Sequence, residues 1–239
     1  MKETTTRYLV TGGAGFIGSH LADALVQRGD HVHILDNLST GSLGNVHHLL
    51  EHPSVTFHEG SILDPRMVSE LVGEADVVIH LAASVGVQLI VQRPLESMIN
   101  NIRGTETVLE ASANLGRKVL VASTSEIYGR NSADGLREDS SRILGPPQKA
   151  RWSYSTAKAV DEILAYAYWR ERETPVIVVR LFNTVGPRQT GAYGMVLPRF
   201  ARQALIGEDV TVFGDGTQRR CFCHVSDVTA ALVGLLDHP

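Results

Sequence analysis

The chain has 239 residues, of which 43% are hydrophobic and 20% charged, and its formal net charge is −4. This balance excludes a disordered chain and offers no basic surface for nucleic acid or for an acidic membrane. No run of about 20 apolar residues is present to span a bilayer. Cys221 and Cys223 are too few for a disulfide framework. We therefore expect a cytoplasmic protein that binds neither nucleic acid nor membrane.

Short apolar runs alternate with amphipathic stretches, a pattern typical of βαβ units in a parallel sheet. The predicted strands are 8–11, 32–36, 55–58, 77–81, 119–123 and 176–181, and the predicted helices lie near 16–28, 65–73, 95–115 and 154–171. Six such strands favour the doubly wound order 3-2-1-4-5-6. We expect an α/β, Rossmann-like, NAD-binding domain over residues 1–182 that carries the catalytic residues.

The pattern changes after Asn183. A loop rich in Gly and Pro is followed by a predicted helix near 196–206, a strand at 210–213, a turn at 214–217, a short strand and a last helix from Ser226. Such a mixed segment favours a small second lobe over another βαβ unit. We interpret residues 183–239 as a partial, truncated C-terminal lobe for substrate binding.

Gly12, Gly15 and Gly18 stand between the first predicted strand and the first predicted helix. They would provide a tight turn, a close approach of the backbone to a diphosphate, and close packing of helix on strand. The helix N-terminus would then attract the anion. Asp36 ends the second strand, where a carboxylate accepts hydrogen bonds from a ribose 2′-OH and repels a 2′-phosphate. The pattern predicts NAD as the cofactor.

Tyr154 and Lys158 are four residues apart on a predicted helix and therefore share one face. An ammonium near a phenol favours the phenolate and would lower the pKa of Tyr154 toward the working pH. Such a tyrosine can take the proton of a hydroxyl while a hydride leaves the same carbon for NAD. The alternative is an ordinary pair on a helix surface.

Together with these features, the chain carries motifs in the order that is typical of one family, from about residue 7 to its end. They are Gly12–Gly18, Leu81-Ala82-Ala83, Asn101 with Gly104-Thr105, Ser123-Thr124-Ser125-Glu126-Ile127-Tyr128-Gly129, Tyr154 with Lys158, Arg180-Leu181-Phe182-Asn183 with Gly186-Pro187, and Arg220 before His224-Val225. The chain resembles the extended short-chain dehydrogenase/reductase family, in particular its nucleotide-sugar epimerases, dehydratases and decarboxylases.

The resemblance implies that Thr124 bonds the sugar hydroxyl that is oxidised, that Tyr154 is the acid/base, and that Lys158 binds the nicotinamide ribose. The implied cofactor contacts are Gly12, Gly15, Phe16, Ile17, Gly18, Asp36, Asn37, Ser61, Ile62, Leu81, Ala82, Ala83, Asn101, Ser123, Tyr154 and Lys158. Asn183 and Arg220 are expected to contact the diphosphate of the substrate, and Arg188 is a weaker candidate for the same role. Ser61 stands where the family usually has Asp.

Members of the family that resemble this chain begin by oxidising the sugar at C4. Glu126 resembles the residue found in decarboxylases and GDP-mannose dehydratases, whereas epimerases commonly have a small residue there. Two residues past Thr124 on an extended chain, it would face C5, unless it only caps or pairs locally. We slightly favour a UDP-glucuronate decarboxylase. A UDP-sugar 4-epimerase, a GDP-mannose-type 4,6-dehydratase and a non-catalytic NAD-binding fragment remain open.

Two further expectations concern partners. The helices near 95–115 and 154–171 carry apolar stripes that resemble the pair through which the family dimerises, so we expect a homodimer; the alternative is packing on the sheet alone. His47, His48 and His52 have helix-like spacing but lack a set of partner ligands, and we predict no metal site.

Overall fold

The computed structural model describes residues 5–85, 92–191 and 195–238, and its main sheet has six parallel strands in the order β3-β2-β1-β4-β5-β6. The strands are β1 (Arg7–Thr11), β2 (His31–Asp36), β3 (Val55–Glu59), β4 (Val77–His80), β5 (Lys118–Thr124) and β6 (Val176–Leu181). The predicted fold class, strand positions and strand order are confirmed. No strand end differs from its predicted position by more than one residue, and the last strand agrees at both ends.

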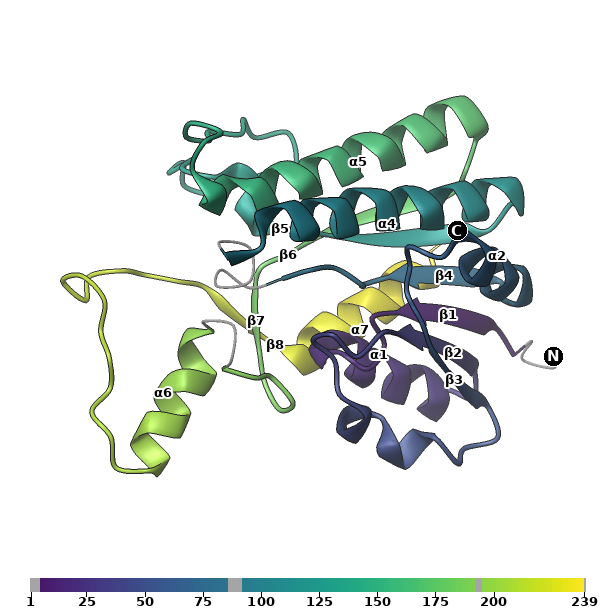
Figure 1. Ribbon diagram of the computed structural model, residues 1–239, viewed down its shortest axis with the longest axis horizontal. Helices are drawn as coiled ribbons and strands as arrows, with labels where there is room; N and C mark the ends of the chain where they lie inside the picture. Colours follow the sequence, from purple (N-terminus) through teal and green to yellow (C-terminus); the bar gives the residue numbers. More distant parts are fainter. Residues whose placement is uncertain (1–4, 86–91, 192–194, 239) are drawn as a thin grey trace.

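Helices cover both faces of the sheet, as Figure 1 shows. The helices α1 (Phe16–Gln27) and α7 (Val225–Leu236) pack on one face, and α2 (Pro65–Glu74), α4 (Pro94–Asn114) and α5 (Ser153–Arg172) on the other. Neighbouring residues of β1 serve opposite faces: Val10 belongs to the first core and Leu9 to the second. In the part of the chain that the structure describes, no helix is long and apolar enough to cross a membrane.

The last helix packs on the sheet rather than within a separate lobe. The α7 side chains of Val228, Leu232 and Leu236 lie in the same core as Leu21 and Leu25 of α1. A division of the chain at residue 182 stays a proposal. In space, however, α7 belongs with the sheet, although it is more than forty residues beyond that division in the sequence.

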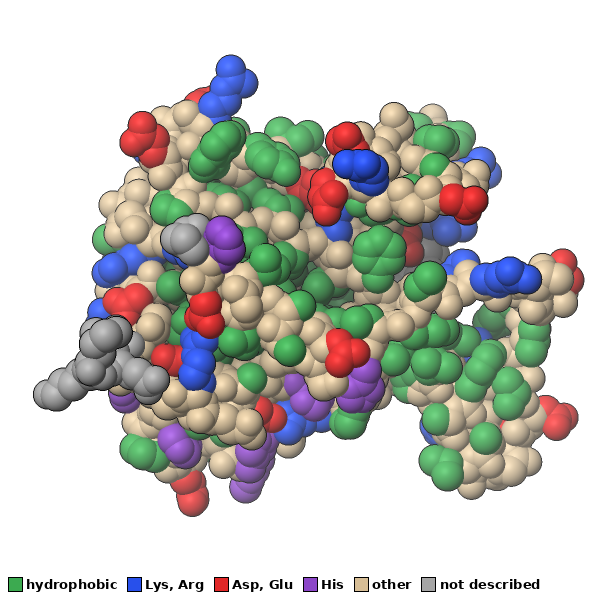
Figure 2. All heavy atoms as spheres, turned by 180° about the vertical axis from the view of Figure 1, so that it is seen from behind, with side chains coloured by type: hydrophobic (Ala, Val, Ile, Leu, Met, Phe, Trp, Pro, Cys, Tyr) green, Lys and Arg blue, Asp and Glu red, His purple; other side chains and the backbone are tan. Residues whose placement is uncertain are grey.

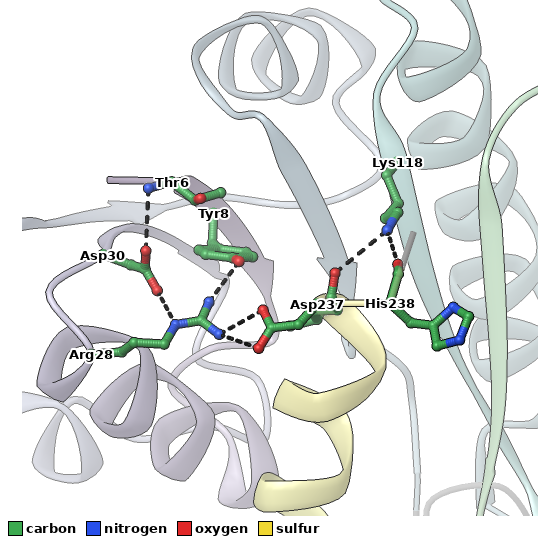
Figure 3. A network of polar contacts seen from close by, with 8 residues as sticks. Thr6, Tyr8, Arg28, Asp30, Lys118, Asp237 and His238 are labelled. Carbon is green, nitrogen blue, oxygen red and sulfur yellow. Dashed lines mark hydrogen bonds and ion pairs between the residues drawn. The ribbon is translucent and has the colours of Figure 1, made fainter. Parts of the chain in front are cut away.

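Charged side chains fix the end of α7 against the sheet (Figure 3). Arg28, just after α1, donates to Asp237 at 2.8 and 3.1 Å, to Asp30 at 2.5 Å and to the Tyr8 hydroxyl at 2.6 Å. Lys118, at the start of β5, donates to two backbone carbonyls at the end of α7. The helix that closes the first core is therefore fastened from β1, α1 and β5 together.

Between β6 and α7 the chain projects away from the sheet (Figure 1). The strands β7 (Asn183–Val185) and β8 (Phe222–His224) form a separate parallel pair, and α6 (Val196–Leu205) has no buried residue. The 3₁₀ helices are η1 (Leu43–Asn45), η2 (His47–Leu49), η3 (Ser125–Tyr128) and η4 (Ala150–Trp152).

The predicted strand at 210–213 is wrong. This segment has no regular secondary structure, and the side chains of Val210, Val212 and Phe213 are exposed. A strand needs the backbone of a neighbouring strand for its hydrogen bonds, and no described strand lies beside this one. Figure 2 shows hydrophobic side chains gathered on the projecting part around α6.

The Arg28 network gives a test of how α7 is held. Replacing Arg28 by Ala removes a partly buried cation with three partners, and we expect the free energy of unfolding to fall by about 1–2 kcal/mol. Arg7→Ala removes an arginine whose pair with Asp76 is more exposed, and we expect a smaller loss. Chemical denaturation of the two variants measures the difference. Equal losses would show that the network does not hold α7.

Candidate active site

The glycine loop lies between β1 and α1 and touches the backbone that follows β4. Gly12 has a φ of +71°, and a Cβ added there would lie 2.8 Å from the Cα atom of Ala82. A Cβ on Gly18 would collide with the carbonyl oxygen of Gly12. No side chain caps α1, whose N-cap is Gly15. The first N–H groups of this helix are thus open to an anion.

The loop after β4, residues 81–83, is held beside this turn. The N–H groups of residues 81 and 82 donate to the carbonyl and the hydroxyl of Thr11, at 3.1 and 3.3 Å. The buried Asn101 of α4 accepts from the Ser84 N–H at 2.7 Å and donates to the Ser84 carbonyl at 3.2 Å. The structure therefore brings Leu81, Ala82, Ala83 and Asn101 together around one loop.

Asp36 lies at the end of β2 and faces the same turn. Its carboxylate accepts the N–H groups of Ala14 at 3.0 Å and of Leu38 at 2.8 Å. Burial raises the pKa of Asp36, and the two hydrogen bonds oppose this shift. The Asn37 side chain accepts hydrogen bonds from Ser39 in a local turn. Asp36 is therefore positioned as a buried acceptor at the edge of the loop.

The remaining predicted cofactor residues differ in their burial and in whether their side chains already have hydrogen-bond partners. Phe16 and Ile17 form the first turn of α1. The Ser61 hydroxyl accepts the Leu63 N–H at 3.1 Å, and Ile62 is buried. The Ser123 hydroxyl is buried at the carboxyl end of β5, and none of the residues that the structure describes forms a hydrogen bond with it. This is unusual unless a ligand serves the hydroxyl. The uncapped helix, the tight glycine turn and this hydroxyl fit NAD.

The end of β5 connects the sheet to the predicted catalytic residues. The Thr124 hydroxyl accepts the Glu126 N–H at 3.2 Å and lies close enough to Tyr154 to lower the pKa of its phenol. The strand stops at Thr124, so Glu126 lies in η3 and the extended chain assumed for it is wrong. Its exposed carboxylate is nevertheless close enough to raise the pKa of Tyr154. Thr124, Glu126 and Tyr154 thus form one group.

The predicted effect of Lys158 on Tyr154 is not found. The pKa of Tyr154 is raised, first by burial and then by the charges of Asp161 and Glu126, while the hydrogen bond to Thr124 opposes the rise. Lys158 instead lies 3.0 Å from the carboxylate of Asp161, one turn further along α5, and both side chains are buried. The two residues share a helix face as expected, but the ammonium is held by another partner.

Two acidic residues of α5 belong to this site, although the sequence patterns did not single them out. Asp161 is one, and Glu162 is the other: it forms two hydrogen bonds with Arg180 of β6, at 2.9 and 2.8 Å. Arg180 also donates to the Tyr128 hydroxyl of η3 at 3.0 Å. Arg180 therefore connects η3, the turn that contains Glu126, to α5. Two acids three and four residues after Lys158, within one turn of the same predicted helix, were the available signal.

The predicted substrate residues fall into two places. Asn183 of β7 donates to the Cys221 carbonyl at 2.9 Å, and Arg220 is exposed just before β8. Arg188, with a φ of +65°, pairs with Asp23 of α1 at 2.8 Å. Asn183 and Arg220 are thus together at the β7–β8 pair, while Arg188 is held against α1. Among the described residues, no group of three potential metal ligands is present.

The glycine turn makes a specific prediction. Gly12→Ala places a Cβ against the backbone of Ala82 at a φ that only glycine adopts easily. We expect the free energy of unfolding to fall by about 1–3 kcal/mol and NAD binding to weaken, measured by calorimetry. Gly73→Ala in α2, where a Cβ would meet open space, is the control and should leave NAD affinity unchanged. NAD affinity that is the same in both variants would rule out this turn as the cofactor site.

Comparisons with known proteins agree with this geometry. The model of the NAD dependent epimerase/dehydratase family matches residues 8–239. A UDP-N-acetyl-alpha-D-glucosaminuronate decarboxylase from Bacillus cytotoxicus is 44% identical over 97% of this chain and 71% of that protein. UDP-glucuronic acid decarboxylase 1 from Xenopus tropicalis is 36% identical over 97% of this chain and 53% of that protein. The chain thus spans between about half and three quarters of these relatives.

A solved structure shows the same fold. UDP-glucuronic acid 4-epimerase from Bacillus cereus, in complex with UDP-glucuronic acid and NAD, has a TM-score of 0.88 at 33% identity, and the match covers 97% of this chain and 73% of that one. Fold, motif order and relatives agree, and the chain belongs to the NAD dependent epimerase/dehydratase family.

Proposed function

We propose that the protein oxidises a UDP-hexuronate at C4 with NAD and then decarboxylates it. UDP-N-acetylglucosaminuronate is the first candidate substrate, because the relative with 44% identity is named for it, and UDP-glucuronate is the next. The observation that carries the proposal is the gathering of Thr124, Tyr154 and the carboxylate of Glu126 at the end of β5. An acid/base, a hydroxyl that orients the sugar and a carboxylate are the groups that this reaction needs.

Thr124 and Tyr154 have different roles in the first step, the oxidation at C4. NAD held at the glycine turn would supply the acceptor for the hydride from C4 of the sugar. Tyr154 takes the proton of the C4 hydroxyl, and Thr124, whose own hydroxyl is fixed by the Glu126 N–H, orients that sugar hydroxyl. Asn183 and Arg220 at the β7–β8 pair would bind the diphosphate, and an arginine suits phosphate oxygens because its planar fork meets two of them.

The second step follows from the product of the first. A ketone at C4 makes the carboxylate on C5 part of a β-keto acid. The carbon–carbon bond to the carboxylate breaks to release carbon dioxide, its electron pair passes to the enolate of the ketone, and the enolate takes a proton at C5. Return of the hydride from the reduced cofactor to C4, with a proton from Tyr154 to the oxygen, would restore the C4 hydroxyl.

Glu126 is exposed and close to Tyr154. If the Glu126 carboxylate lies against the substrate carboxylate, the two negative charges repel each other. Loss of carbon dioxide takes the substrate carboxylate away and relieves this repulsion.

A UDP-sugar 4-epimerase is the second candidate, because the Bacillus cereus neighbour with that activity has the same fold. Epimerisation also begins with oxidation at C4, so Thr124 and Tyr154 would serve both reactions equally. The difference lies at C5, where only decarboxylation changes the mass of the sugar. Glu126 favours decarboxylation.

Incubation with UDP-N-acetylglucosaminuronate and NAD separates these reactions. We expect a product lighter by one carbon dioxide in mass spectrometry. Tyr154→Phe should lower turnover by at least about 100-fold and leave NAD binding intact, whereas Glu126→Gln should slow the release of carbon dioxide more than the oxidation at C4. A product of unchanged mass that separates from the substrate on chromatography would establish the epimerase instead.

A homodimer and a cytoplasmic location are further parts of the proposal. Both cysteines are unpaired, as in a reducing compartment. The helices α4 and α5 lie side by side (Figure 1) and expose large apolar side chains, among them Leu95, Ile163 and Trp169. Such a surface suits a second copy of the same helix pair.

The dimer is tested by the mass in solution. Ile163→Lys places a charge within this apolar surface, and we expect it to shift the protein from dimer to monomer in sedimentation. Leu205→Lys, at an exposed position of α6, is the matched control and should leave the mass unchanged. A monomeric unmodified protein, or an Ile163→Lys variant that stays dimeric, would contradict this arrangement.

A further inference from the structure

The guanidinium of Arg180 is shared by several parts of the chain. Arg180 lies on β6, the last strand of the main sheet. It donates to both carboxylate oxygens of Glu162 on α5, at 2.9 and 2.8 Å, and to the Tyr128 hydroxyl of η3 at 3.0 Å. A fourth hydrogen bond, of 2.8 Å, goes to the carbonyl oxygen of Glu138. Arg180 therefore joins the sheet, α5 and the turn that contains Glu126.

The division of these hydrogen bonds requires an arginine. Nε and Nη2 meet the two oxygens of Glu162, and Nη1 is left for Tyr128 and the Glu138 carbonyl. A guanidinium is planar and holds its donors in a fixed fork, whereas the ammonium of a lysine is a single point. The side chains of the ion pair expose only 17% and 5% of their surface, so salt screens the pair little. The Glu162 carboxylate thus fixes the direction from which Nη1 meets Tyr128.

η3 packs on α5 at the place where Arg180 holds it. Ile127 and Tyr128 of η3 form a small buried cluster with Ala159 of α5. Tyr128 exposes only 4% of its surface, so its hydroxyl lies where a direct hydrogen bond is stronger than in water. The hydrogen bond from Arg180 therefore fixes the buried end of η3 against α5.

Glu126 has little freedom within this turn. Its N–H donates to the Thr124 hydroxyl at 3.2 Å, and its carbonyl accepts the Gly129 N–H at 3.0 Å. Tyr128 follows it by two residues in the same turn. The backbone of Glu126 is thus held between the end of β5 and the ring that Arg180 fixes, while its side chain is exposed.

The same contacts relate Glu126 to Tyr154. Tyr154 and Glu162 are eight residues apart on one helix, α5. Because a helix rises by about 1.5 Å per residue, they are separated by about 12 Å along its axis. A turn that is fastened beside Glu162 is therefore fastened at a set distance from Tyr154. In the proposed reaction, oxidation at C4 needs Thr124 and Tyr154, whereas the loss of carbon dioxide from C5 depends on where Glu126 lies.

We propose that Arg180 is a positioning residue for decarboxylation, because its hold on Tyr128 sets where the Glu126 carboxylate lies relative to C5 of the sugar. The inference rests on the proposed function. A looser hold would leave oxidation at C4 intact and slow the loss of carbon dioxide from the 4-keto sugar. The hydride then returns to C4 while the carboxylate is still on C5, which regenerates the substrate or forms its 4-epimer.

Tyr128→Phe tests this role, because it keeps the ring and its packing and removes only the hydroxyl that Arg180 contacts. Single turnovers with NAD and UDP-N-acetylglucosaminuronate give two rates, one from the absorbance of the reduced nicotinamide and one from the release of carbon dioxide. We expect the release of carbon dioxide to slow by about 10-fold and the oxidation at C4 to change by less than about twofold. Tyr8→Phe is the matched control: it removes a tyrosine hydroxyl that accepts from Arg28 at 2.6 Å, and both rates should stay unchanged.

Two further variants separate positioning from a general loss of structure. In a protein that already carries Glu126→Gln, Tyr128→Phe should slow the release of carbon dioxide no further, because the hydroxyl acts through the Glu126 carboxylate. Arg180→Lys keeps the charge beside Glu162 without the fork and should have a larger effect of the same kind. Circular dichroism confirms the fold of each variant, and if Arg180→Lys does not fold, Tyr128→Phe decides. Losses that multiply in the double variant, or equal slowing of both steps in Tyr128→Phe, would overturn the proposal.

Amide hydrogen exchange of residues 125–129 measures the hold on η3 without any substrate. In the NAD-bound protein, Tyr128→Phe should speed this exchange by about 5-fold, and Tyr8→Phe should not. Unchanged exchange in Tyr128→Phe would overturn the proposal, whatever the substrate. Faster exchange in a protein that oxidises no UDP-hexuronate would contradict the proposed function and confirm that Arg180 holds η3.

Discussion

The side-by-side parallel pairing of β1 with β4 and of β4 with β5 brings the chemically active segments of this protein to one edge of the sheet. The glycine turn follows β1, the Leu81–Ala83 loop follows β4, and Thr124 ends β5. Parallel strands leave a sheet at the same edge, and ligands of doubly wound folds bind there. The backbone of Ala82 against Gly12 leaves no room for a side chain in the turn.

Buried charges then position the catalytic helix on this edge. Arg180 and Glu162 join β6 to α5 and, through Tyr128, to the turn that carries Glu126. Lys158 and Asp161 form a second buried pair, within α5 itself. Breaking a buried pair leaves an uncompensated charge and is costly, so the Arg180–Glu162 pair restricts where α5 can lie. The position of Tyr154 next to Thr124 depends on that restriction.

The sheet and the cofactor turn were predictable because their signals are local. Apolar runs of strand length and the spacing of Gly12, Gly15 and Gly18 need no knowledge of distant residues. The strand expected at 210–213 failed because a strand depends on a neighbour that the sequence pattern does not reveal.

The position of α7 escaped prediction for a related reason. The apolar stripe of α7 shows that the helix is buried, but not that α1 is what covers it. Tertiary contacts, rather than local preference, set this feature. The partner of Lys158 is a different case, because Asp161 follows it by three residues on the same helix and the signal was local.

The central claim is that this edge of the sheet oxidises a UDP-hexuronate at C4. A single turnover with UDP-N-acetylglucosaminuronate that carries deuterium at C4, quenched and examined by mass spectrometry, tests it most directly. We predict that the deuterium is recovered in the nicotinamide ring of the cofactor before it returns to the sugar. A cofactor that stays unlabelled at every time while carbon dioxide is released would contradict the account.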